Sequence, residues 1–178
     1  MKAARMIPIV VSLVACSEFA GPSTYVGRED QLLQTDKTEY TARYTGGNGS
    51  PRRYSFQVVT RFHNTQPNRV YLARCYPTSP TPIYGVEAVD PSDRWGAAYD
   101  PAWACVGHED PIAVAPGATR VDTLRLTGPT STDGRTGEPY GVLTGVFRIG
   151  YSVHTCRREI GCELPNAGVS NTFRVVTD

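Results

Sequence analysis

The stretch 53-RYSFQVVTRFHN-64 carries the clearest structural signal in this chain of 178 residues. Alternate residues at its centre share one face, and that face is mostly apolar: Phe56, Val58, Thr60 and Phe62. Successive side chains of a β-strand point to opposite sides of a sheet, so this alternation indicates a strand with one buried face. The other face carries Gln57 and Arg61, which suits contact with water.

Alternation of the same period recurs along the chain, between turns rich in glycine, proline and asparagine. The chain has 17 glycines and 14 prolines, and no segment shows a convincing helical period. Short strands separated by such turns are typical of two antiparallel sheets packed face to face. We therefore predict an all-β protein, with one antiparallel β-sandwich domain of about seven to nine strands. The domain is expected to span residues 36–178.

The start of the chain has the pattern of a secretory leader. Residues 1–5, MKAAR, carry Lys2 and Arg5 without an acid, and residues 6–14 form a short apolar run. That run is far shorter than the roughly 20 residues that a helix needs to cross a bilayer. A basic start, a short apolar centre and a small residue before the cut define an export signal. We predict that residues 1–15 direct export and are then removed.

The end of this leader, 13-LVAC-16, resembles the processing site of bacterial lipoprotein precursors, in which leucine, an aliphatic residue and a small residue precede a cysteine. The resemblance implies that the Cys16 thiol receives a diacylglycerol and that the chain is cut before Cys16. Several acyl chains would give stable anchoring in a membrane. Residues 16–35 would then form the lipidated start and a flexible tether. In the enterobacterial sorting pattern, Ser17 directly after the lipidated cysteine implies the outer membrane. The alternative is an ordinary export signal cut nearby, for example after Ala20.

Four cysteines remain once Cys16 is assigned to the anchor: Cys75, Cys105, Cys156 and Cys162. An even number of cysteines in an exported chain predicts two disulfides. Four cysteines allow three pairings. Cys156 and Cys162 enclose only the residues RREIG, a loop short enough to close locally, so we prefer this pair. Cys75 would then pair with Cys105.

The same thiols, taken with His108 and His154, are an alternative metal site. Their spacings are not those of zinc sites, and an oxidising compartment favours disulfides. Asp93 and Asp100 could join the acidic residues after His108 around Ca²⁺, but no EF-hand spacing is present. We expect neither a metal nor another cofactor.

Three histidines are the first candidates for catalysis. His63 lies on the outward face of its predicted strand, and His154 is close to a cysteine. His108 is followed by Glu109 and Asp110, and a histidine beside a carboxylate can serve as a general base. Neighbouring loop residues usually point apart, however, and neither Gly-x-Ser-x-Gly nor His-Glu-x-x-His occurs. We therefore predict no catalytic residue and a protein that is not an enzyme.

The order of the predicted strands resembles small immunoglobulin-like sandwich domains of bacterial envelope proteins. The resemblance rests on a strand ending FHNTQPNRVYL, a central RWGAAY, then IAVAPGATRVDTLRL, GVFRIGYSV and a final NTFRVV. It is similar, too, to the sandwich of bacterial intracellular-proteinase inhibitors. The likeness runs from residue 62 to residue 176, and it implies a fold more than a function.

Two segments are candidates for recognition. The stretch DRWGAAYDPAWAC places Trp95, Tyr99 and Trp103 close together, and aromatic loops at the end of a sandwich often bind partners. The alternative is that one tryptophan caps the core and the other packs on the disulfide. Arg157 and Arg158 lie in the small loop between the last two cysteines, where a constrained basic loop could meet a protease.

Composition narrows the function further. The net charge is +1, so the chain lacks the basic excess of a nucleic-acid-binding protein, and we expect no nucleic acid as a partner. Only Lys2 and Lys37 are lysines, and an excess of arginine either favours bidentate contacts with anions or reflects codon usage. The sequence predicts a lipid-anchored envelope protein, a non-catalytic binding or structural module for a protein or glycan. A protease inhibitor is the alternative, and a hydrolase or metal protein comes third.

Overall fold

The computed structural model describes residues 25–28, 30–45, 54–89, 92–99, 110–128, 131–132, 139–140, 144–157, 162–165 and 167–178. Regular structure in these ranges consists of strands, which confirms the all-β prediction. Among the same residues, no helix is long and apolar enough to cross a membrane. The strands are β1 Leu33–Thr35, β2 Glu39–Tyr44, β3 Tyr54–His63, β4 Val70–Leu72, β5 Tyr84–Val89, β6 Trp95–Tyr99, β7 Ile112–Val114, β8 Thr119–Gly128, β9 Ser131–Thr132, β10 Pro139–Tyr140, β11 Gly145–Tyr151, β12 Val153–His154 and β13 Phe173–Thr177.

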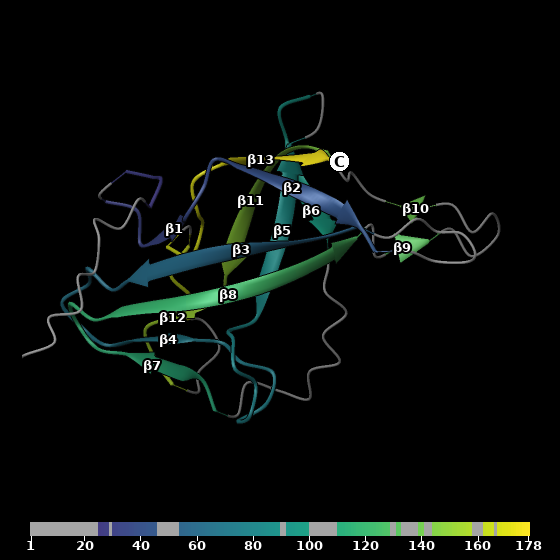
Figure 1. The fold of residues 1–178 in the computed structure, drawn as a ribbon. Coiled ribbons are helices and arrows are strands. Elements are labelled where there is room, and N and C mark those ends of the chain that lie inside the picture. The colour runs from purple at the N-terminus through teal and green to yellow at the C-terminus, as the bar shows by residue number, and fades with distance from the viewer. Residues whose placement is uncertain are drawn as a thin grey trace, which may run out of the picture.

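The two longest strands, β3 and β8, form an antiparallel pair along their whole length (Figure 1). The predicted inner face of β3 is buried throughout, and β8 adds Leu124 and Leu126 to the same side. The outer face of the pair is mostly polar, with Gln57 directly opposite Arg125. The alternation in the sequence therefore predicted both the strand and its buried face.

The N-terminal strands join this pair to the rest of the main sheet. β1 is antiparallel to the end of β3, with Leu33 opposite Phe62, and β2 then leaves β3 to run parallel to β13. The strand order is β1-β3-β2-β13-β11-β5-β6, with β8 on the other edge of β3. The sheet is mixed, so the prediction of antiparallel pairing throughout is wrong for β2 and β13. Alternation tells which face is buried and not which way the neighbouring strand runs.

The ordered fold begins before residue 36. β1 lies within the stretch expected to be a tether, Leu32 and Leu33 are buried, and Val26 bridges Thr35. A strand of three consecutive buried residues has no alternation that could signal it. Thirteen strands occur among the described residues where about seven to nine were predicted, because a strand of two or three residues is too short to show alternation. Several of the additional strands, including β7, β9, β10 and β12, have only two or three residues.

One hydrophobic core joins the two halves of the main sheet. Phe62 of β3 stacks on Tyr151 of β11 with ring centroids 6.5 Å apart, although these strands are not neighbours in the sheet. Tyr40 of β2 meets Phe173 of β13 edge to face at 5.2 Å. In Figure 1, β3 and β8 run across β5 and β11. The two halves therefore face each other, and their inner residues form a single cluster.

Buried polar groups lie inside this core. The hydroxyl oxygens of Tyr151 and Thr60 are 2.6 Å apart, and Thr60 also donates to the Asp122 carbonyl at 3.3 Å. The Asp122 carboxylate is almost fully buried and accepts two bonds from Arg120, at 2.5 and 2.9 Å. Each of these buried groups therefore has a partner, as burial requires.

Stability is expected to fall as the pH rises above about 10, where tyrosine in an unfolded chain loses its proton. In the fold, burial raises the pKa of Tyr40, Tyr84 and Tyr151. The folded state then holds more protons than the unfolded state, so each of these tyrosines lowers the free energy of unfolding by up to about 1.4 kcal/mol per pH unit. Urea titrations between pH ~8 and pH ~11 would measure the slope, and Tyr151→Phe should reduce it. A free energy that does not change with pH would contradict the burial.

Candidate functional site

A groove opens on the outer face where β2 separates from β3. The β2–β3 ladder contains only the pairs Arg43–Ser55 and Tyr44–Tyr54. On the same edge of β3, pairing with β1 begins at Thr60. Residues 56–59 of β3 therefore lie outside both ladders on this edge. The resulting hollow, called the β2–β3 groove here, has a volume of about 990 Å³. It is lined by Lys37, Glu39, Tyr40, Thr41, Arg43, Thr45, Ser55, Phe56, Gln57, Arg125 and Thr127.

Three cations and one carboxylate give the groove a positive balance. Arg43 of β2, Arg125 of β8 and Lys37 line it together with Glu39, and all four residues are exposed. Arg43 and Arg125 flank β3 on either side, and their backbones are about 12 Å apart, two strand spacings across and two residues along β3. None of the three cations forms an ion pair with another residue in the described part of the chain.

A fixed tyrosine lies beneath these charges. The Tyr40 hydroxyl donates to the Asp36 carboxylate at 2.6 Å and accepts the Lys37 amide at 3.2 Å. The same Asp36 oxygen accepts the Val59 amide at 3.0 Å, and Val59 returns its carbonyl to the Asp36 amide. Burial, and then the bond to Asp36, raises the pKa of Tyr40. The hydroxyl therefore stays protonated at neutral pH and acts as a structural support, not as a base.

In the aromatic segment predicted to bind a partner, one aromatic ring already contacts another side chain of the same chain. Trp95 begins β6, and the Arg148 guanidinium lies 4.3 Å from the centroid of its ring. Arg148 also pairs with Glu87 of β5 at 2.5 Å. One face of the Trp95 ring is thus covered by a cation of the same sheet. Tyr99 is placed at the far end of β6, and Trp103 lies outside the described residues.

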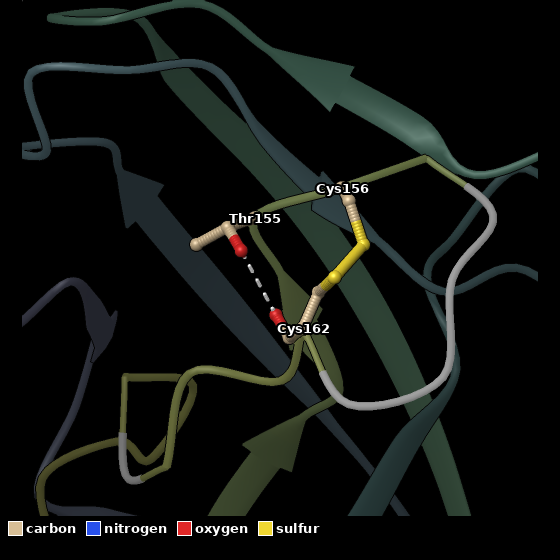
Figure 2. Close-up of a disulfide and its surroundings, with 3 residues drawn as sticks. All are labelled: Thr155, Cys156 and Cys162. Carbon is tan, nitrogen blue, oxygen red and sulfur yellow. Dashed lines mark hydrogen bonds between the residues drawn. A yellow bond between two sulfur atoms is a disulfide. The ribbon is translucent and has the colours of Figure 1, made fainter.

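The predicted disulfide between Cys156 and Cys162 is confirmed (Figure 2), with an S–S distance of 2.08 Å. Thr155 donates its hydroxyl to the Cys162 carbonyl at 3.2 Å and so ties the two ends of the loop again. Cys75 is disulfide-bonded as well, and its predicted partner Cys105 lies outside the described residues. The Cys75–Cys105 pairing therefore stays a prediction.

Replacing Cys156 and Cys162 together with serine is expected to lower the free energy of unfolding by about 2 kcal/mol. The loop is short, so the disulfide removes little entropy from the unfolded chain and its loss is at the lower end of the usual range. Urea denaturation of the variant and the parent without a reducing agent measures the difference. An unchanged unfolding midpoint would mean that this disulfide adds nothing to stability.

In the basic loop between these cysteines, Arg157 is exposed but also contacts a carboxylate. The Arg157 side chain is 59% exposed, and its guanidinium lies 3.5 Å from the Asp110 carboxylate. Asp110 also accepts a bond from Arg74 at 2.5 Å, so it sits between two arginines. Arg158 lies outside the described residues.

Among the described residues, the catalytic and metal-binding candidates weighed from the sequence are not grouped into a site. His63 shares a hydrogen bond with the Thr119 hydroxyl at 2.9 Å, and His154 shares one with the Ser152 hydroxyl at 2.9 Å. His108, with its neighbour Glu109, lies outside the described residues. Within the described part of the chain, no three His, Cys, Asp or Glu side chains are grouped so that they could hold a metal ion.

No protein-family model and no curated protein matches the chain. Among solved structures, it is similar to the Pseudomonas fluorescens alkylpurine DNA glycosylase AlkC bound to DNA containing an abasic site analog. The sequence identity is 11% and the TM-score is 0.32 over 82% of this chain. The match spans 31% of the glycosylase, which is about a third of its length. A likeness at this level assigns neither a fold family nor a function.

Proposed function

We propose that the chain is a lipid-anchored envelope protein whose immunoglobulin-like β-sandwich is a non-catalytic binding module. The β2–β3 groove is the observation that carries the binding role. It combines an open hollow, three cations without ion-pair partners among the described residues, and hydroxyl and amide groups on rigid strands. Polar groups held on strands are a suitable scaffold for recognition.

The strand order supports the immunoglobulin-like assignment. In such a sandwich, strands B and E pair in one sheet, and strands C, F and G lie together in the other. Here β3 pairs with β8, while β5, β11 and β13 are adjacent. Taken in chain order, these five strands match the order B, C, E, F and G, which supports the proposed assignment.

The leader supports the anchor and the location. The sequence 13-LVAC-16 follows a basic start and a short apolar run, and the remaining four cysteines suit an oxidising compartment. The confirmed Cys156–Cys162 disulfide agrees with export. We place the protein at the cell envelope, held through acylated Cys16, and Ser17 favours the outer membrane.

A fractionation experiment tests this proposal. The full chain, expressed in a bacterium that processes lipoproteins, should sediment with membranes and be released by detergent but not by high salt. Cys16→Ala should remove acyl labelling and release the chain from the membrane fraction. Cys75→Ala serves as a matched control, because it removes a different cysteine, one that is disulfide-bonded, and should leave acyl labelling intact. Equal labelling of the parent and Cys16→Ala would refute the anchor.

Protease inhibition is a second candidate, favoured by one observation. Arg157 is exposed on a loop that the Cys156–Cys162 disulfide closes, and a constrained basic loop fits a protease that cleaves after arginine. If this role is right, the chain slows such a protease, and Arg157→Ala abolishes the effect. Full protease activity in the presence of an excess of the parent chain would remove this candidate.

A further inference from the structure

We propose that the β2–β3 groove binds an extended glycan that carries carboxylate or phosphate groups. This inference deepens the proposed binding function and rests on it. It names the chemical class of the ligand, which neither the fold nor the predicted anchor specifies.

The charges of the groove favour an anion. Arg43 and Arg125 lie on opposite sides of β3, opposite Ser55 and Gln57 respectively. A guanidinium presents a planar fork of donors that matches a carboxylate or phosphate in two parallel bonds. The backbones of the two arginines are about 12 Å apart, so two anionic groups on one chain fit better than a single small ion. Lys37 adds a third positive charge at the end of the groove.

The remaining lining favours a glycan over an apolar ligand. Thr41, Thr45, Ser55 and Thr127 contribute hydroxyl groups, and Gln57 contributes an amide. Each of these groups both donates and accepts hydrogen bonds, which is the pattern that sugar hydroxyls require. The apolar residues Tyr40 and Phe56 are buried, with 4% and 6% of their surface exposed, so they offer little surface to an apolar ligand.

The geometry disfavours a peptide strand. A peptide that added to the edge of β3 would need free backbone amide and carbonyl groups on this strand. Both groups of Val59 already form hydrogen bonds with Asp36. Ser55 is paired with Arg43 of β2. Only a short edge between these positions lies outside the ladders, which is too little for strand addition. A flat bilayer is also disfavoured, because the arginines belong to a hollow and not to a protruding surface.

The experiment measures equilibrium binding of fluorescently labelled polymers to the full chain, purified with its anchor in neutral detergent. Polygalacturonate tests carboxylate glycans, phosphomannan tests phosphate glycans, and dextran is the neutral control. Polyglutamate and vesicles containing phosphatidylglycerol test the rejected peptide and membrane alternatives. We expect one or both anionic glycans to bind more tightly than dextran, with an affinity that falls several-fold as salt screens the charges.

Three variants locate the site. Arg43→Gln with Arg125→Gln should weaken binding about tenfold or more, because two charge-assisted contacts are lost. Arg69→Gln is the matched control, since Arg69 is exposed in the turn that follows β3, at the end of this strand opposite to the groove residues Ser55 and Gln57, and should bind like the parent. Glu39→Gln removes the groove carboxylate and should strengthen binding about two- to threefold. Damage to the fold would not produce such a gain.

The outcomes separate this inference from the proposed function. No binding of either anionic glycan, or equal losses in the double variant and Arg69→Gln, overturns the anionic-glycan site. Tighter binding of polyglutamate or of anionic vesicles, lost in the same double variant, overturns the choice of a glycan. Binding of dextran that the double variant leaves unchanged would move recognition away from the groove. The fractionation result for Cys16→Ala stands independently of all these outcomes.

Discussion

Replacing Phe147 with alanine is expected to lower the free energy of unfolding by about 3–5 kcal/mol. Phe147 is fully buried at the centre of β11, where it stacks on Phe173 with centroids 6.1 Å apart. It also lies opposite Ala88 of β5, so strands are paired on both sides of it. Those ladders prevent the core from closing around the lost ring, and a cavity would remain.

Urea denaturation measures this loss, and the neighbouring residue supplies the control. Val146 precedes Phe147 on the same strand, points to the other face and is half-buried. Val146→Ala should therefore cost much less, about 1 kcal/mol. Similar losses in the two variants would mean that β11 does not have one core face and one outer face.

Replacing Gly168 with alanine is expected to destabilise the fold by about 3 kcal/mol. A Cβ atom at Gly168 would clash with the Tyr151 carbonyl oxygen and lie 2.9 Å from a methyl group of Val153. The Gly168 carbonyl also accepts the Tyr151 amide at 2.8 Å, so the two backbones are held together. Adding a methyl group must push them apart and break this bond.

The matched control for this substitution lies on β11. A Cβ at Gly150 meets nothing within 4 Å, so Gly150→Ala should be neutral or slightly stabilising. Thermal unfolding of both variants gives the comparison. A Gly168→Ala protein that melts at the parent temperature would show that the close approach to Tyr151 is absent in solution.

The longer strands could be predicted from the sequence because one face of each is buried, and apolar residues therefore recur at every second position. β3, β8 and β11 alternate over seven to ten residues, and the structure buries alternate residues of each, including the expected face of β3. The short loop between Cys156 and Cys162 likewise allowed that disulfide to be predicted from spacing. β1 could not be predicted, because its three residues are all buried, and the parallel pairing of β2 with β13 leaves no mark in local sequence.

The groove could not be predicted, because it arises from strand register. Arg43 and Arg125 are far apart in the chain, and only the placement of β2 and β8 on either side of β3 brings them to one hollow. Outward-facing arginines on alternating strands were the available signal, but alternation does not tell which strands are neighbours. Residue type alone points to Trp95 as a recognition residue, and its contact with Arg148 has no signal in the spacing of the sequence.

The most direct test of the central claim, an anchored and disulfide-stapled envelope module, is the intact mass of the chain from the native membrane fraction, before and after reduction. The account predicts a chain that starts at Cys16, carries the mass of acyl groups and gains about 4 Da when two disulfides are reduced. A chain that starts elsewhere without acyl mass would contradict the anchor and the envelope location. Four free thiols would contradict the disulfides and reopen the metal site that the cysteines could form.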